Sequence, residues 1–254
     1  MMALEIKQFP CLSDNYGFLI RDEATGACAA IDTPDAEAIA AEAERAGWRL
    51  THVLNTHHHW DHAGGNLALK EKYGLTIIGP KGEDIPGRDV AVSDGDVVEL
   101  GASLARVIGT PGHTAGHIVY HFEDDGVAFV GDTLFALGCG RLFEGTPTQM
   151  WSSLSRLAAL PEETRVYCAH EYTQANARFA ETVDPANEAL RIRIGEIDAT
   201  RAKGEPTVPT SIGLEKATNP FLRAGDPALR EALDMASATD TDVFAEVRRR
   251  KDHF

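Results

Sequence analysis

The 254-residue sequence has few cysteines and no long apolar run. Its cysteines are scattered and form no C-x-x-C pair, so we expect reduced thiols and no disulfide framework. No apolar run reaches the roughly 18–20 residues that a membrane span requires. The first residues also lack the basic and apolar regions of a secretory signal. We therefore expect a cytoplasmic protein without a membrane partner. The cysteines are Cys11, Cys28, Cys139 and Cys168.

Basic charge is also scarce. The formal net charge is −15, with a sequence pI near 5.0. Binding to phosphate backbones needs a basic surface, so this charge argues against nucleic acid as the main partner. An anionic small molecule remains compatible with this charge where basic residues cluster locally. The length suits one large domain with a small appendage, and we expect a monomer, with a dimer as the alternative.

One segment concentrates groups that bind metal. Residues 51–66 read T-H-V-L-N-T-H-H-H-W-D-H-A-G-G-N, so several imidazoles and a carboxylate follow a short apolar strand. A divalent cation stabilises such crowding, because it binds neutral imidazole and carboxylate together. Side chains alternate along an extended segment, so we expect two pairs of ligands, each facing its own ion, with His58 pointing away. The alternative is a surface loop that binds metal only adventitiously. The pairs are His57 with His59, and Asp61 with His62.

Three later strands end at further candidate ligands. T-P-G-H-T-A-G-H (110–117) carries His113, V-A-F-V-G-D-T (127–133) ends near Asp132, and V-Y-C-A-H-E-Y-T (166–173) carries His170. Residues at strand ends can form a site without disturbing the core. The competing interpretations are a core histidine at 113 and a helix N-cap at 132. We expect His117 to hydrogen-bond a ligand rather than bind metal.

These motifs resemble a known enzyme family. T-H-H-H-W-D-H is similar to the T-H-x-H-x-D-H signature of the metallo-β-lactamase superfamily, and W-D-H-A-G-G-N resembles the form found in glyoxalase II, the hydroxyacylglutathione hydrolases. The resemblance implies an α/β fold, the four-layer αββα sandwich, with a small C-terminal helical domain. It also implies a shared set of ligands. These are His57, His59 and His113 on one ion, Asp61, His62 and His170 on the other, and Asp132 on both.

Two divalent ions per chain are therefore expected, zinc first, with iron or manganese as alternatives, since imidazole and carboxylate suit all three. Such a pair holds a bridging water and lowers its pKa toward neutrality. Asp61 is the expected catalytic residue, which orients the metal-bound hydroxide. A thioester suits this chemistry, because a thiolate leaves without strong general-acid help.

The substrate is inferred from other segments. G-C-G-R-L-F-E-G-T (138–146) resembles the glyoxalase II loop that contacts glutathione, with Arg141 at its basic position and Phe143 where tyrosine is usual. Tyr172 matches a second contact, and Arg248 and Lys251 match basic contacts on one helical face. The alternative for this basic run is a solvated helix end, where cations are favoured by the helix dipole.

The resemblance implies hydrolysis of S-(2-hydroxyacyl)glutathione, above all S-D-lactoylglutathione, to glutathione and D-lactate. This is the second step of methylglyoxal detoxification. Alternatives are a persulfide dioxygenase, a lactonase or a nuclease on the same fold, or a metal-binding protein without catalysis. The dioxygenase would need only two histidines and one carboxylate on iron, so it would not require His170.

Periodicity and turn residues predict the order of the elements. Strands are expected at 3–9, 16–21, 27–32, 51–55, 76–78, 96–99, 103–109, 117–122, 126–130 and 166–170. Helices are expected at about 35–46, 63–73, 150–160, 187–201, 226–236 and 241–251. Residues 79–87 are expected to form an irregular surface loop, and residues 207–223 a loop-like stretch. We place a boundary near residue 173, with a catalytic domain over 1–173 and a helical substrate-binding domain over 174–254.

Overall fold

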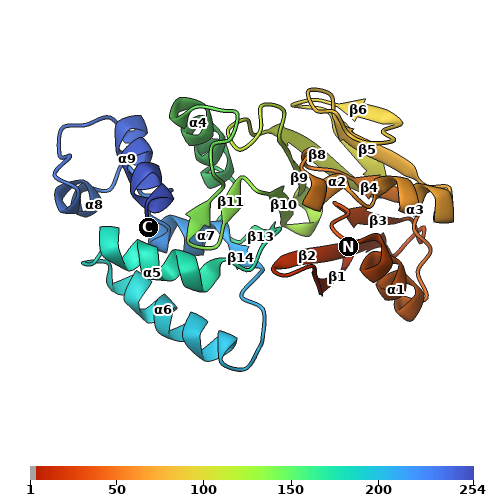
Figure 1. The fold of residues 1–254 in the computed structure, drawn as a ribbon, viewed down its shortest axis with the longest axis horizontal. Coiled ribbons are helices and arrows are strands. Elements are labelled where there is room, and N and C mark those ends of the chain that lie inside the picture. Colours follow the sequence, from red (N-terminus) through yellow and green to blue (C-terminus); the bar gives the residue numbers. More distant parts are fainter. Residues whose placement is uncertain (1–3) are drawn as a thin grey trace. The chain divides into compact units, whose positions relative to one another are not determined.

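The computed structural model of the protein describes residues 4–254 and has α/β architecture (Figure 1). It contains two compact units. One comprises the chain up to Gly109 together with Ala115–Gly131, and the other comprises Thr110–Thr114 with Asp132–Phe254. Residue 3, where the first strand was predicted to begin, lies outside the described residues.

A mixed β-sheet forms one layer of the first unit. Its strands lie in sequence order, antiparallel from β1 to β3 and parallel from β3 to β6. Because the carboxyl ends of parallel strands meet at one edge, the residues that follow β3 and β4 lie close together. The strands are β1 (Leu4–Cys11), β2 (Asn15–Asp22), β3 (Cys28–Ile31), β4 (His52–Leu54), β5 (Thr76–Pro80) and β6 (Val90–Val92).

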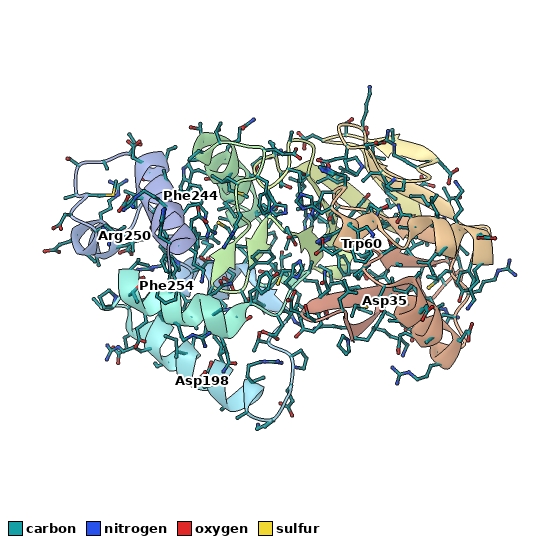
Figure 2. All side chains as sticks on the ribbon, viewed as in Figure 1. Asp35, Trp60, Asp198, Phe244, Arg250 and Phe254 are labelled. Atoms are coloured by element: carbon teal, nitrogen blue, oxygen red, sulfur yellow. The ribbon has the colours of Figure 1, made fainter. Side chains whose placement is uncertain are left out.

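Helices α1 (Ala36–Ala46) and α3 (Asn66–Tyr73) cover one face of this sheet. Asp35, at the start of α1 (Figure 2), accepts hydrogen bonds from two backbone amides of its first turn, and Gly47 ends the helix with φ +68°. Asp35 is thus the N-cap and Gly47 the C-cap of this helix, as residues of these types favour. Ile39 of α1 and Leu69 of α3 are buried in one cluster with Val53 of the sheet.

The other face of the sheet packs on a second set of strands in the same unit. The strands β7 (Val97–Leu100), β8 (Ser103–Gly109), β9 (Ile118–Phe122) and β10 (Val127–Gly131) form an antiparallel meander. Phe18 of β2 lies edge-on to Phe129 of β10, with ring centroids 5.6 Å apart. The buried Tyr120 hydroxyl donates a hydrogen bond to the Asn55 carbonyl. The two sets of strands therefore pack against each other and share one buried core.

The second unit is mainly helical. Its core includes the aromatic rings of Phe179, Phe221 and Phe244, each about 6.0 Å from the next between centroids. Two short strand pairs accompany the helices, β11 (Leu134–Phe135) with β12 (Gly138–Cys139) and β13 (Arg165–Cys168) with β14 (Thr210–Ser211). The helices are α4 (Pro147–Ala158), α5 (Thr173–Val183), α6 (Glu188–Arg201), α7 (Ile212–Thr218), α8 (Pro227–Ala232) and α9 (Asp240–Asp252). Within residues 4–254, no helix is both long and apolar enough to cross a membrane.

Most predicted strands and the helices now labelled α1, α4, α6 and α9 are confirmed. The predicted helix over 63–73 is wrong in its start, because the chain is already helical in α2 (Trp60–Ala63) and breaks before α3. Helix α5 was not predicted, and the expected loop over 207–223 contains β14 and α7. The 79–87 segment is not simply a surface loop, since Glu83 and Ile85 are buried.

Candidate metal centre and substrate pocket

The histidine segment forms a short loop between β4 and α2. His57 and His59 lie together, with 3.1 Å between Nε2 of the first and Nδ1 of the second. The His58 side chain does not join them, because its Nδ1 pairs closely with the Glu83 carboxylate. The expected alternation along this segment is therefore present.

The second predicted pair lies on α2. Nε2 of His62 is 3.6 Å from Oδ2 of Asp61. The Asn15 amide donates a hydrogen bond of 3.2 Å to the same carboxylate oxygen and holds it in place. Since α2 begins at Trp60, Asp61 and His62 occupy a helical turn rather than a flexible loop, which fixes their spacing.

Asp32 is a site residue that the sequence analysis missed. Its carboxylate accepts hydrogen bonds from the Thr56 amide at 2.7 Å and from His62 Nδ1 at 2.8 Å. Because Nδ1 faces Asp32, Nε2, which faces Asp61, is the nitrogen of His62 that could bind a cation. A signal did exist: Asp32 ends an apolar strand and precedes a threonine, as Asp132 does.

Glu83 was missed as well. Its buried side chain accepts the His58 amide at 3.1 Å through one oxygen and the Gly116 amide at 2.7 Å through the other. The 79–87 segment thus ties the histidine loop to the segment before β9. The sequence offered no indication of this, because the contacts join distant residues.

In the second unit one carboxylate lies between two imidazoles. Oδ2 of Asp132 is 3.4 Å from Nε2 of His113, and Oδ1 is 3.4 Å from Nε2 of His170. His113 donates from Nδ1 to the Arg141 carbonyl at 2.8 Å, so its Nε2 faces the carboxylate. Each carboxylate oxygen therefore has its own imidazole neighbour, an arrangement that fits a carboxylate shared by two cations.

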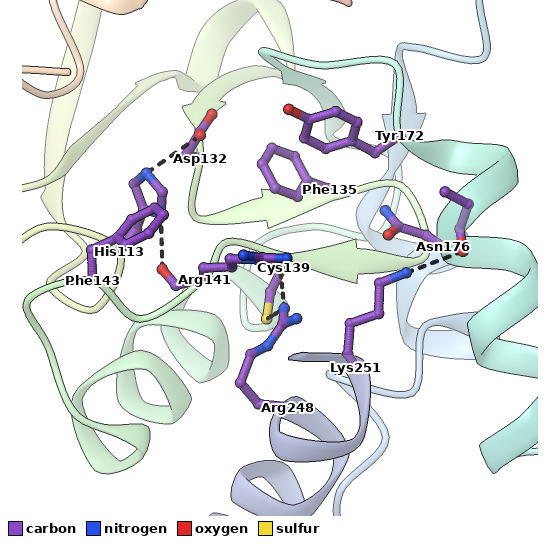
Figure 3. A pocket seen from close by; sticks show the side chains of 11 residues that line it. His113, Asp132, Phe135, Cys139, Arg141, Phe143, Tyr172, Asn176, Arg248 and Lys251 are labelled. Carbon is purple, nitrogen blue, oxygen red and sulfur yellow. Dashed lines mark hydrogen bonds and ion pairs between the residues drawn. The ribbon is translucent and has the colours of Figure 1, made fainter. Parts of the chain in front are cut away.

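A cavity of about 390 Å³ opens beside these residues within the same unit (Figure 3). His113 and Asp132 lie at one end of it. The side chains of Arg141, Arg248 and Lys251 bring positive charge to the other end. A cavity with candidate metal ligands at one end and cations at the other suits a ligand whose reactive centre lies far from a carboxylate.

Lys251 is strongly affected by its surroundings. Its Nζ donates to the Ala175 carbonyl at 3.1 Å. Burial, followed by the nearby charges of Arg248, Arg178 and Arg141, lowers the pKa of Lys251 to about 8. A carboxylate bound here would offset this repulsion and favour the charged amine.

Arg248 differs from the expectation of a simple ligand contact. It is 5% exposed, donates from Nη1 to the Cys139 carbonyl at 3.0 Å, and pairs through Nη2 with Asp252. The guanidinium also lies over the Phe221 ring. Much of its hydrogen-bonding capacity is therefore used to attach α9 to the pocket wall.

Two aromatic residues flank the predicted ligands. Tyr172 stacks on His170 with 4.7 Å between ring centroids, and its side chain reaches the pocket. Phe143 is 63% exposed and meets His113 edge-on at 5.3 Å. Arg141, two residues earlier in the chain, is also exposed, so both line an open part of the cavity.

Comparison with known proteins identifies the family. A model of the metallo-beta-lactamase superfamily matches residues 18–170, and a model described as the hydroxyacylglutathione hydrolase C-terminus matches residues 171–254. The chain is 60% identical over 256 residues to a protein of Maricaulis maris (strain MCS10) named hydroxyacylglutathione hydrolase, with 100% of each covered. The chain belongs to the hydroxyacylglutathione hydrolase family. It is thus a hydrolase of the metallo-β-lactamase superfamily, and the predicted fold class is confirmed.

Solved structures agree with this fold for a member of the hydroxyacylglutathione hydrolase family. ETHE1 from Myxococcus xanthus is 30% identical with a TM-score of 0.70, covering 96% of this chain and 90% of that one. TTHA1623, solved in a di-iron-bound form, is 24% identical with a TM-score of 0.61, covering 86% and 100% respectively. Superfamily membership and the His and Asp clusters together indicate a binuclear metal site.

Proposed function

We propose that the chain hydrolyses S-(2-hydroxyacyl)glutathione, S-D-lactoylglutathione above all, to glutathione and the free 2-hydroxy acid. The observation that carries the proposal is the cavity in the second unit, where candidate metal ligands and a group of cations lie at opposite ends. The match of residues 171–254 to the hydroxyacylglutathione hydrolase C-terminus favours this reaction over the dioxygenase, lactonase and nuclease alternatives.

The proposed ligands are the residues that the resemblance indicates. They fall into two groups of imidazoles with an associated carboxylate, and the donor atoms of His62 and His113 are oriented by hydrogen bonds at Nδ1. Zinc is the proposed metal, with iron or manganese as alternatives. The assignment is His57, His59 and His113 for one ion, Asp61, His62 and His170 for the second, and Asp132 for both.

Two divalent cations held by these residues would acidify a water molecule and polarise the thioester carbonyl. The protein's own groups supply orientation. Asp61, which accepts a hydrogen bond from Asn15, would accept another from the attacking water. Asp32 keeps His62 in one tautomer, so the geometry of the ligands is fixed before substrate arrives.

The glutathione part would occupy the cationic end of the cavity. Arg141 and Lys251 are the proposed partners of its carboxylates, and charge-assisted contacts of this kind are among the stronger hydrogen bonds. Arg248 would contribute charge while also holding the wall. Phe143 cannot donate a hydrogen bond and offers only an apolar face, whereas Tyr172 carries a hydroxyl that can donate one.

The remaining expectations become proposals of the same account. The helical domain over 174–254 would bind the glutathione part, and the catalytic domain over 1–173 would supply the metal ligands. We propose a cytoplasmic monomer whose partner is this small thioester, with neither nucleic acid nor membrane as a partner.

The test follows the thioester absorbance of lactoylglutathione with the wild-type protein and with His170→Ala. We expect turnover by the wild type and a loss of at least about a hundredfold in the variant, because removing a ligand disrupts the second ion. Arg156→Ala, a change on α4 away from the cavity lining, serves as the control. Wild-type protein that leaves lactoylglutathione intact, or a fully active His170→Ala variant, would contradict the proposal.

A further inference from the structure

The β11–β12 hairpin joins the two ends of the cavity. It lies between Asp132 and Arg141 in the chain, and it contributes Phe135 and Cys139 to the lining (Figure 3). Its turn includes Leu137, which has φ +58°. A non-glycine residue persists in this region only where its surroundings determine the conformation.

Buried side chains from a distant segment hold this turn. Asn219 donates from Nδ2 to the Phe135 carbonyl at 3.2 Å and to the Gly138 carbonyl at 3.0 Å. The Leu137 amide donates to Oε2 of Glu215 at 2.9 Å. Both residues belong to E-K-A-T-N-P (215–220), a motif that the proposed chemistry does not otherwise use.

Two other elements complete the attachment. Asn176 of α5 donates to the Ala136 carbonyl at 3.0 Å, and Arg248 of α9 donates to the Cys139 carbonyl. Gly138 has no room for a side chain, since an added Cβ would lie 2.5 Å from Nδ2 of Asn176. Side chains of three helical segments therefore bind consecutive backbone groups of the hairpin, whose own strands are only two residues long.

Glu215 is itself firmly anchored. It is fully buried, and its Oε1 accepts from Arg193 Nη2 at 2.5 Å and from the Thr210 hydroxyl at 2.6 Å. The Asn219 amide also reaches Oε2 of Glu215 at 2.9 Å. A buried carboxylate with this many donors is held in a single position.

We propose that Glu215 and Asn219 are positioning residues that set the span between the two ends of the cavity and thereby select glutathione thioesters over smaller ones. By fixing the hairpin they fix how far Arg141 lies from Asp132 along the wall. A glutathione thioester bound at the cationic end then has its carbonyl at the candidate metal ligands. If the hairpin loosens, the carbonyl of a bound glutathione thioester no longer lies at the candidate metal ligands. A small thioester that binds only beside those ligands does not depend on the position of the hairpin. The inference rests on the proposed function.

The experiment compares Asn219→Ala with wild type on lactoylglutathione and on the lactoyl thioester of N-acetylcysteamine, which lacks both glutathione carboxylates. We expect the ratio of the two kcat/KM values to fall about tenfold, mainly through KM for the glutathione thioester, since the two hydrogen bonds from Asn219 to the hairpin are lost. Metal content and kcat/KM for the small thioester should stay within about twofold of wild type. Hydrogen exchange of the Leu137 amide should accelerate.

Asp184→Asn is the matched control. Asp184 is buried in the same unit and accepts from Arg223 Nε at 2.9 Å, but it does not line the cavity. The Asp184→Asn change should lower the free energy of unfolding and leave the ratio of the two kcat/KM values unchanged. Should Asn219→Ala fail to fold, Asn219→Ser carries the test, because it retains a donor and leaves space for water.

A folded, metal-loaded Asn219 variant with the wild-type ratio would overturn the inference. So would an equal loss on both thioesters, since that result indicates a structural role alone. Failure of the proposed function looks different. Wild-type protein would then not hydrolyse lactoylglutathione, whereas exchange of the Leu137 amide would still report whether Asn219 holds the hairpin.

Discussion

At the scale of one residue, Asp32 orients the proposed ligand His62 through a hydrogen bond and is not itself a proposed ligand. It lies at φ +56°, a conformation that asparagine also accepts, so Asp32→Asn should not disturb the backbone. The change removes the charged acceptor beside His62 Nδ1. We expect metal affinity to fall about 10–100-fold, measured by competition with a chelator of known affinity.

Asp22→Asn is the control for that measurement. Asp22 is equally buried in the first unit and accepts from the Thr25 amide at 2.8 Å and the Ser103 hydroxyl at 3.0 Å. The Asp22→Asn change should lower the free energy of unfolding without changing metal affinity. Equal metal affinity in wild type and Asp32→Asn would show that His62 needs no such partner.

Lys251 gives a prediction about pH. Its pKa is lowered to about 8, so the free enzyme has a charged amine below that pH and a neutral one above it. The groups that face it are Arg248 on α9, Arg178 on α5, Arg141 and Cys139 on the pocket wall, and the rings of Phe179 and Phe254. We expect kcat/KM for lactoylglutathione to decrease as pH rises through about 8, because a partner of the substrate carboxylate is lost.

Lys251→Arg tests the assignment, since a guanidinium stays charged throughout this range. Its kcat/KM should be nearly flat between about pH 7 and pH 9, whereas Lys251→Met should be low and equally flat. A wild-type profile shared by all three proteins would assign the pH dependence to another group.

At the scale of elements, the 79–87 segment supports the histidine loop through Glu83. Glu83→Gln replaces one acceptor oxygen with a donor that faces a backbone amide, His58 or Gly116. We expect metal affinity to fall by about tenfold or more, together with the melting temperature, as buried donors lose their partner. Glu42→Gln, at a buried carboxylate on α1 that pairs with Arg45, should leave metal affinity unchanged.

The elements also show what a sequence can predict. Helix α1 carries a capping residue, an apolar face and a terminal glycine, so its prediction needed no tertiary information. Helix α5 has no side-chain cap at its start, and α7 is short and lies among prolines. Both depend on contacts between residues far apart in the chain, such as that of Asn176 on α5 with the Ala136 carbonyl and that of Glu215 on α7 with Arg193.

The candidate site divides in the same way. Its histidines and acids were predicted because they end strands and match a familiar spacing. Asn15 and Glu83 orient those residues through distant contacts, which no local pattern reveals, so their roles required the folded structure. Asp32 did carry a signal, since it follows an apolar strand and precedes a threonine, but its contact with His62 is visible only in the fold.

At the scale of the whole molecule, the proposed hydrolysis depends on cations bound by the two groups of proposed ligands. Removal of metal with a chelator should abolish thioester hydrolysis while leaving most of the fold intact, because each unit has its own packed core. Circular dichroism before and after chelation checks the fold. Unfolding on metal removal would mean that the ions also stabilise the structure.

The most direct test titrates zinc into the metal-free protein while lactoylglutathione turnover is followed. The account predicts no turnover at the start and an increase that levels off near two equivalents of metal per chain. Full turnover by the metal-free protein, or a plateau reached without any bound metal, would contradict it.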